Sequence, residues 1–215
     1  MKNIILNDLK EHKVIAILRG LEPQEAVATA EALYAGGIRF AEVAFGGGIP
    51  DARCAEAILA VYRAMGEKMH IGAGSVTDLR RLTYAMENGA SYIISPDTNC
   101  QIIEETVRNG LISMPGALTP TEICEAYRYG AHVVKVFPVT AMQKNYIKDI
   151  HAPLSHIPLV AVGGMNPDNI TEYIRQGAVA VGMGSGLVDN QLVKAGDYAE
   201  LTARAARCVE NLNTL

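Results

Sequence analysis

The sequence contains few cysteines, and none of them is placed as a redox pair or as part of a metal site. The 215 residues include no C-x-x-C pair and no histidine–cysteine or histidine–carboxylate cluster at metal-binding spacing. The four cysteines are scattered, at Cys54, Cys100, Cys124 and Cys208. We therefore expect free thiols in a reducing compartment, the cytoplasm, and no bound metal.

Long basic runs and long apolar runs are also missing. The net charge is -4, and no apolar stretch reaches the length needed to cross a membrane. Residues 1–13 alternate charged residues with short apolar pieces, so they lack the apolar core of a signal peptide. With 49% hydrophobic and 20% charged residues, the composition is that of a globular protein. We expect one soluble domain over residues 1–215, with no nucleic-acid or membrane partner.

What the sequence does contain is a repeated pattern of an apolar run followed by a segment of helical periodicity. Predicted strands cover Val14–Leu18, Phe40–Ala44, His70–Gly72, Tyr92–Ser95, Ile112–Met114, Val133–Phe137, Leu159–Val162 and Val179–Gly182. Predicted helices cover Pro23–Ala35, Ala52–Met65, Asp78–Asn88, Asn99–Arg108 and Thr121–Tyr129, and a closing helix lies within Gly196–Leu215. Left-handed helix ends are expected at Gly36-Gly37, Gly89, Gly110, Gly130 and Gly177.

Eight such strand–helix units without a linker favour an α/β fold, the closed parallel TIM (β/α)8 barrel, as a single domain. The alternative is an open, doubly wound sheet, which usually carries a glycine-rich dinucleotide fingerprint after its first strand. The turn at residues 18–23 does not match that fingerprint. In the barrel, functional residues lie at the carboxyl ends of the strands, so those positions supply the site candidates.

A lysine, Lys135, lies in the middle of the apolar sixth strand. Removing an ammonium group from water is costly unless the group is paired or loses its proton. One interpretation is that the Lys135 side chain reaches solvent or pairs with a carboxylate. The other is that burial keeps the amine neutral, so that it can attack a carbonyl.

Glu42 is a second charged residue on an apolar strand, and alternation places it on the same face as Phe40 and Ala44. If that face lines the barrel interior, Glu42 and Lys135 share one small space. They are then either a structural ion pair or a general base beside an amine nucleophile. Burial raises the pKa of a carboxyl and lowers that of an amine, whereas pairing opposes both shifts.

Glycine-rich turns follow the seventh and eighth strands, at Gly163-Gly164 and at Gly184-Ser185. Backbone N–H groups in such turns bind phosphate in this fold, although glycines of ordinary tight turns have the same composition. Arg19, at the end of the first strand, is a second candidate for anion binding, with a solvated surface position as the alternative.

Taken together, these motifs resemble the 2-keto-3-deoxy-6-phosphogluconate (KDPG) and 4-hydroxy-2-oxoglutarate (KHG) aldolase family. The matching segments span nearly the whole chain: Ile15–Gly20, Glu42-Val43, Gly72–Val76, Ile94–Pro96, Pro115-Gly116, Lys135–Pro138 and Val162–Gly164. The resemblance implies a class I aldolase on a (β/α)8 barrel, which uses no metal or cofactor and is usually a homotrimer. Its partners would be small molecules, a 2-oxo acid and a phosphorylated aldehyde.

By matching position, the resemblance implies that Lys135 forms the Schiff base and that Glu42 moves protons. The predicted substrate-binding residues are Arg19, Ser75 (where the family usually has threonine), Pro96 and Thr119. The implied phosphate-binding residues are Gly163, Gly164, Gly184 and Ser185. One departure is Gly46, which stands where the family usually has an arginine that binds the substrate carboxylate. More of the anion binding then falls to Arg19.

The implied reaction is the cleavage of KDPG, KHG or both to pyruvate and an aldehyde, either glyceraldehyde 3-phosphate or glyoxylate. The chain would then be a carbon–carbon lyase. Its Leu-Arg-Gly and Val-Gly-Gly-Met segments also resemble the branch that acts on the galactonate epimer (KDPGal). Outside aldolases, the same loops would serve a sugar-phosphate isomerase, which needs no lysine in mid-strand. They would also serve an inactive protein that binds sugar-acid phosphates, and the glycine at position 46 keeps this hypothesis open.

Overall fold

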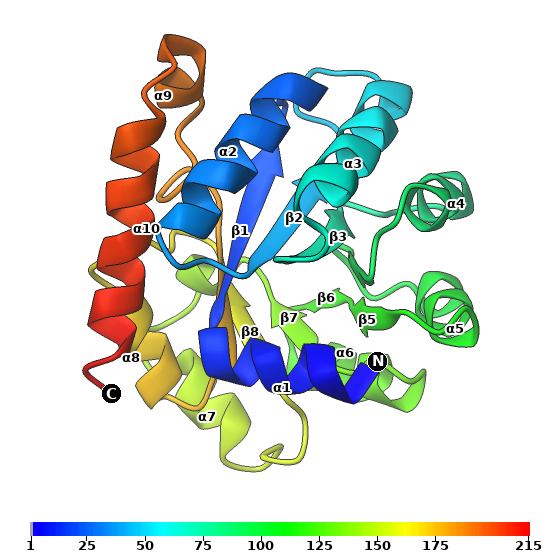
Figure 1. Cartoon of the computed structure of the whole chain (residues 1–215). Helices are drawn as coiled ribbons and strands as arrows, with labels where there is room; N and C mark the ends of the chain where they lie inside the picture. Colours follow the sequence, from blue (N-terminus) through cyan, green and yellow to red (C-terminus); the bar gives the residue numbers. More distant parts are fainter. Residues whose placement is uncertain (1) are drawn as a thin grey trace.

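The computed structural model describes residues 2–215, which form alternating strands and helices (Figure 1). The strands are β1 (Val14–Arg19), β2 (Phe40–Ala44), β3 (His70–Gly74), β4 (Tyr92–Ile94), β5 (Ile112–Met114), β6 (Gly116–Ala117), β7 (Val134–Val136), β8 (Leu159–Val162) and β9 (Ala180–Met183). The helices are α1 (Lys2–His12), α2 (Pro23–Ala35), α3 (Asp51–Met65), α4 (Leu79–Glu87), α5 (Cys100–Arg108), α6 (Pro120–Arg128), the 3-10 helix η1 (Val139–Ala141), α7 (Tyr146–His151), α8 (Ile170–Arg175), α9 (Asn190–Ala195) and α10 (Tyr198–Leu212).

All the strands belong to one parallel sheet, in the order β5-β4-β3-β2-β1-β9-β8-β7-β6. The two strands at the ends of this order, β5 and β6, are separated in the chain only by Pro115, so they occupy one position of a closed sheet. Across that position, the N–H of Lys135 donates to the carbonyl of Pro115 at 2.9 Å. The sheet therefore closes on itself, and the predicted (β/α)8 barrel is confirmed.

Two separate apolar clusters divide the protein into a barrel interior and an outer layer. The interior cluster consists of strand residues together with Ile5 and Leu9 of α1, which lies across the end where the strands begin (Figure 1). The outer cluster packs the opposite faces of the strands against the surrounding helices. Because strands covered on both faces must be apolar throughout, β1 and β2 read as continuous hydrophobic runs with few exceptions. Because α1 closes the end where the strands begin, a functional site is expected at the other end, where the strands finish.

Local signals in the sequence begin several helices. Helix α6 starts with a capping box, in which Thr119 and Glu122 satisfy each other's backbone N–H groups, and Pro120 occupies the first turn. Helix α2 has the same arrangement, with Glu22 as its N-cap and Pro23 at its start. These caps fix where the loops after β1 and β6 end, and therefore how those loops border the strand ends.

Most predicted elements are confirmed to within one or two residues, and β2, β5, β8 and α2 match at both ends. The predicted glycines after the helices adopt positive φ, at Gly37, Gly89, Gly110, Gly130 and Gly177. Gly36 has a φ of -80° and is required for another reason. A Cβ at Gly36 would lie 2.4 Å from the Cβ of Ala205, because α2 and α10 approach closely there.

The strand predicted over Val133–Phe137 is confirmed as β7, one residue shorter at each end, and the chain turns into η1 after Pro138. The first helix of the chain was missed. No helix was predicted within residues 1–13, whereas Lys2–His12 form α1. Its alternating charges belong to an amphipathic helix that buries Ile5 and Leu9, which are four residues apart.

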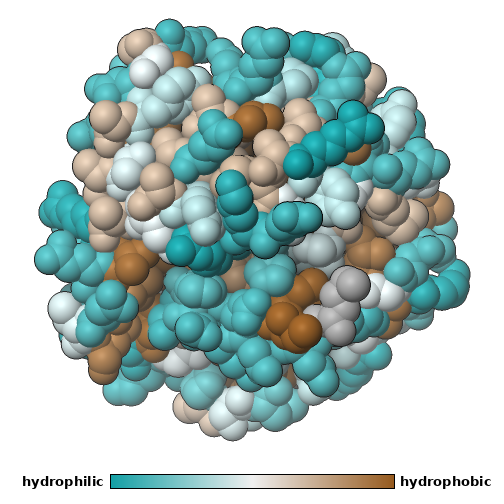
Figure 2. All heavy atoms as spheres, in the orientation of Figure 1, coloured by the Kyte–Doolittle hydropathy of each residue, from teal (hydrophilic) through white to brown (hydrophobic). Residues whose placement is uncertain are grey.

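The surface is largely hydrophilic on the face shown in Figure 2, with small, separate apolar patches. Within residues 2–215, no helix has both the length and the apolar character needed to span a membrane. The four cysteines are free thiols, and Cys54 and Cys208 are buried.

Candidate active site

Lys135 lies inside the barrel, on β7, with only 7% of its surface exposed. Its Nζ is 4.7 Å from the ring centre of Phe137, the next residue on the same face of the strand. Burial lowers the pKa of the Lys135 amine, and the charge of Arg19 lowers it further, while Glu42 acts in the opposite direction. The prediction of a buried lysine is confirmed, and the alternative that Lys135 reaches solvent is wrong.

Glu42 lies inside the barrel on β2, 2% exposed, between Phe40 and Ala44 of the interior cluster. Its carboxyl group extends over Gly74 of β3, where a Cβ would lie 1.5 Å from Oε1. The same Oε1 is buried and has no hydrogen-bond partner within residues 2–215. Burial raises the pKa of the Glu42 carboxyl, against smaller opposing effects of Lys135 and Arg19. The carboxyl group is therefore poised to accept a proton.

The two groups influence each other without forming a direct ion pair. No Glu42–Lys135 salt bridge occurs among the ion pairs of the part of the chain that the structure describes. Each group acts electrostatically on the pKa of the other, yet burial is the largest cause of both shifts. A locked structural ion pair would leave neither group free to react. The arrangement instead fits an amine nucleophile and a base in one apolar chamber.

Arg19 lies at the carboxyl end of β1 and is exposed, with its guanidinium turned toward the end of β3. Its Nη2 donates to the hydroxyl of Ser75 at 3.1 Å, and its Nη1 donates to the carbonyl of Phe45 at 3.4 Å. Ser75 has a φ of +56°, an uncommon conformation for a residue with a side chain. Two of the predicted substrate-binding residues are thus brought together, although they lie far apart in the sequence.

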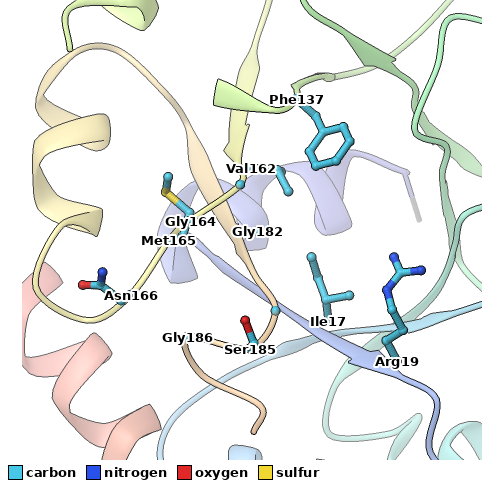
Figure 3. Close-up of a pocket in the computed structure, with 12 residues that line it drawn as sticks. Ile17, Arg19, Phe137, Val162, Gly164, Met165, Asn166, Gly182, Ser185 and Gly186 are labelled. Atoms are coloured by element: carbon cyan, nitrogen blue, oxygen red, sulfur yellow. The ribbon is translucent and has the colours of Figure 1, made fainter. Parts of the chain in front are cut away.

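A cavity of about 360 Å³ opens beside this chamber at the strand ends (Figure 3). The side chains of Ile17, Val162 and Phe137 point toward one another along its inner wall. The cavity is lined by all four predicted phosphate-binding residues and by Arg19: Arg19, Gly163, Gly164, Gly184 and Ser185. Lys135 and Glu42 are not among the lining residues but are neighbours of two of them. The Nζ of Lys135 lies 4.7 Å from the ring centre of Phe137, and Glu42 is in register with Ile17.

The glycine turns present free backbone donors to this cavity. Gly163 and Gly164 have φ values of +114° and +65°. Within residues 2–215, the N–H groups of Gly164, Ser185 and Gly186 make no hydrogen bond. Unpaired N–H groups around a cavity suit an anion, which offers several acceptor oxygens.

The other two predicted residues have different settings. Pro96 is half-buried, and its carbonyl packs against Gly116, where a Cβ would lie 2.3 Å from that oxygen. Gly116 pairs with Lys135, so Pro96 borders the lysine through this glycine. Thr119 is the N-cap of α6, and its hydroxyl bonds Glu122 as donor and as acceptor. The capping role already uses the Thr119 hydroxyl, and Thr119 is not among the residues that line the cavity.

Sequence reasoning missed three residues at the site. Phe137 was assigned no role, although alternation from Lys135 places it on the same face. Met165 and Asn166 line the cavity beyond the glycine turn (Figure 3). Met165 ends the Val-Gly-Gly-Met segment noted in the sequence but was assigned no role, and no pattern in the sequence points to Asn166. No group of three or more potential metal ligands occurs within residues 2–215.

Comparison with known proteins shows the family of the chain. Residues 5–204 match the family described as "Aldolase: KDPG and KHG aldolase". The chain is 34% identical to the 2-dehydro-3-deoxy-6-phosphogalactonate aldolase of Escherichia coli (strain K12), over 90% of each chain. It is 30% identical to the 2-dehydro-3-deoxy-phosphogluconate aldolase of Treponema pallidum (strain Nichols), over 96% of each chain.

A solved structure extends the comparison to the chemistry of a relative. The KDPG aldolase of Legionella pneumophila, with pyruvate captured at low pH as a covalent carbinolamine intermediate, is 25% identical. Its TM-score to this chain is 0.81, with 91% of this chain and 93% of that chain covered. The fold and the matched relatives agree. The chain belongs to the KDPG and KHG aldolase family and is a carbon–carbon lyase.

Proposed function

We propose that residues 1–215 form a single-domain class I aldolase that cleaves KDPG, KHG or both, with Lys135 as the nucleophile. The observation that carries this proposal is the state of Lys135. This lysine is only 7% exposed and forms no ion pair among residues 2–215, and burial lowers its pKa. A lysine in that state is neutral in a larger fraction of molecules at neutral pH, and the neutral amine is the nucleophile. A sugar-phosphate isomerase would need no such lysine.

The reaction begins when the amine of Lys135 attacks the C2 ketone of the substrate. Loss of water from the resulting carbinolamine gives a protonated imine, which is an electron sink. Glu42, directly or through a water molecule, takes the proton from the C4 hydroxyl, and the bond between C3 and C4 breaks. The electron pair of that bond moves into the imine and forms an enamine, while the aldehyde leaves. Protonation at C3 and hydrolysis then release pyruvate and regenerate the lysine.

The two ends of the substrate are held by different groups of residues. The pyruvyl end lies by Lys135, near Ser75 and Pro96, and Arg19 supplies a positive charge close to Ser75. The phosphate end binds the free backbone N–H groups of the turns at 163–165 and 184–186. KHG has no phosphate, so its cleavage would not depend on these turns.

The galactonate epimer KDPGal is a second candidate substrate. One observation supports it: the relative with 34% identity is a 2-dehydro-3-deoxy-6-phosphogalactonate aldolase. The residue at position 46, a glycine where the family usually has an arginine, leaves the choice between the epimers open. Gly46 has a φ of +85°, and a Cβ there would meet no atom within 4 Å. Coupled pyruvate assays with KDPG, KDPGal and KHG at equal concentrations would rank kcat/KM for the three.

Trapping with borohydride tests the nucleophile. The protein is reduced in the presence of pyruvate, and intact-mass and peptide mass spectrometry then locate the adduct. We expect a reduced pyruvyl adduct on Lys135. A folded protein that binds a phosphorylated sugar acid but forms no adduct would contradict the proposal and favour an inactive binding protein.

We also propose a homotrimer in the cytoplasm. The family resemblance supports the trimer, and the four free thiols support a reducing compartment. Light scattering after size exclusion would measure the mass of the particle, and a monomer or dimer at micromolar concentration would contradict the trimer.

A further inference from the structure

Tyr92 is a buried polar residue of the barrel interior that the proposed mechanism does not use. It lies on β4, its side chain is fully buried, and it belongs to the interior cluster together with Phe40 and Ile94. Its hydroxyl has no hydrogen-bond partner within residues 2–215. A buried hydroxyl is costly to leave unpaired, so this one needs an explanation.

The register of the sheet places Tyr92 beside Glu42. Glu42 of β2 pairs with Gly72 of β3, and Gly72 pairs with Tyr92 of β4, so the three residues form one row across three strands. Because Gly72 has no side chain, the Tyr92 ring lies over it, and a Cβ at Gly72 would be only 2.1 Å from the ring. Glu42 in turn lies over Gly74, the next inward position of β3. The two polar side chains therefore share the surface of β3.

Both members of this pair carry an unsatisfied buried oxygen, Oε1 of Glu42 and Oη of Tyr92. The phenol can donate one hydrogen bond, and an ionised carboxylate can only accept. Burial and the nearby charge of Glu42 raise the pKa of Tyr92 well above its ordinary value, so the phenol keeps its proton. A donor and an acceptor that have no other partner within residues 2–215 thus lie side by side over Gly72 and Gly74.

We infer that Tyr92 is a positioning residue for Glu42: the hydroxyl of Tyr92 donates a hydrogen bond to one water molecule, which in turn donates to Oε1 of Glu42. This inference rests on the proposed role of Glu42 as the base. The bond favours the ionised carboxylate, and it therefore opposes the rise in the Glu42 pKa that burial causes. It also holds Oε1, so that the other carboxyl oxygen faces the substrate. Tyr92 would not contact the reacting atoms.

The test variant is Tyr92→Phe, which keeps the ring over Gly72 and removes only the hydroxyl. Without the donor, the pKa of Glu42 rises, so the acid limb of the kcat profile moves to higher pH. We expect kcat near pH 7 to fall about tenfold, the loss expected for one hydrogen bond to a charged group. The KM and the trapping of pyruvate on Lys135 should change little.

Two further variants separate a hydrogen bond from a packing effect. Tyr146→Phe removes the half-buried hydroxyl that donates to the carbonyl of Leu118, and it should leave the acid limb in place. Site-specific replacement of Tyr92 by 3-fluorotyrosine gives a more acidic phenol and a stronger donor, so the acid limb should move to lower pH. Circular dichroism and thermal unfolding would establish that each variant is folded.

Carbon-13 NMR of glutamate carboxyl groups gives a readout that does not depend on activity, with the Glu42 signal assigned by its loss in Glu42→Gln. The Glu42 pKa should be higher in Tyr92→Phe than in the wild type. An unchanged Glu42 titration, or an equal change in Tyr146→Phe, would overturn the inference even if Lys135 traps pyruvate. Failure of the proposed function would be recognised separately, by a wild-type protein that forms no pyruvate adduct.

Discussion

The guanidinium of Arg19 donates a hydrogen bond from Nη2 to the hydroxyl of Ser75, with 3.1 Å between the two atoms. The residues are 56 positions apart, and the bond joins the carboxyl end of β1 to the loop after β3. It holds the guanidinium across one side of the strand ends. The same charge lowers the pKa of both Lys135 and Glu42.

Arg19→Gln should weaken substrate binding more than it slows the chemical step. Glutamine retains polar contacts but loses the charge, so KM should rise about tenfold or more, as expected for a hydrogen bond to a charged group. Ser75→Ala, which removes only the hydroxyl, should raise KM less. Steady-state kinetics of both variants would check this, and an Arg19→Gln variant with wild-type KM would contradict a role in binding.

Lys135→Ala should abolish both turnover and the pyruvate adduct, because no other buried lysine occurs within residues 2–215. Lys135→Arg should fail as well, since a guanidinium stays charged and forms no imine under these conditions. The control is Lys148→Ala on the exposed face of α7, which should retain the adduct. Borohydride trapping with peptide mapping measures the result, and an adduct that survives in Lys135→Ala would place the nucleophile elsewhere.

Glu42→Gln should lower kcat by about 10²–10⁴-fold, the range for general acid–base catalysis, while Lys135 still forms the imine. The variant should also move the pH dependence of trapping. The negative charge of Glu42 raises the pKa of Lys135, so its removal lowers that pKa further. Neutral amine then persists to lower pH, and the trapping profile should extend in that direction. A profile that moves to higher pH would show that the two groups do not interact as described.

Gly74→Ala should inactivate the enzyme without unfolding it. A Cβ at this position would lie 1.5 Å from Glu42 Oε1, so the carboxyl group has to move, whereas the backbone conformation permits alanine. Ala73→Gly, at the neighbouring position that faces the helices, is the control and should cost only about 1 kcal/mol of stability. Activity and thermal unfolding of the two variants would separate these effects.

Gly184→Asp should discriminate between phosphorylated and unphosphorylated substrates. A Cβ at Gly184 meets no atom within 4 Å, so the side chain fits, and its carboxylate would repel a phosphate in the cavity. KM should rise strongly for KDPG or KDPGal and little for KHG, while Gly184→Ala should behave like the wild type. An equal rise for all three substrates would locate the phosphate elsewhere.

Several features of the fold and site could be predicted from residue types and spacing. The period of the apolar runs indicated the barrel, because strands covered on both faces must be apolar throughout. Alternation on β2 placed Glu42 on one face with Phe40 and Ala44, and the structure shows that this face is the barrel interior. The helix α1 was missed because its amphipathic pattern is short and lies among charges that resemble a solvated terminus.

Residue order alone shows which strand carries each reactive group, and the period of two along a strand shows which side chains share a face with it. Which of the two faces is the interior does not follow from that period. The folded structure was needed to show that Glu42 and Lys135 share the interior without an ion pair among residues 2–215. It was also needed to show that Tyr92 lies over Gly72 beside Glu42. Contacts between strands depend on register and on how the barrel closes, here at Pro115. Those are set by packing of the whole sheet and leave no trace in the local sequence pattern.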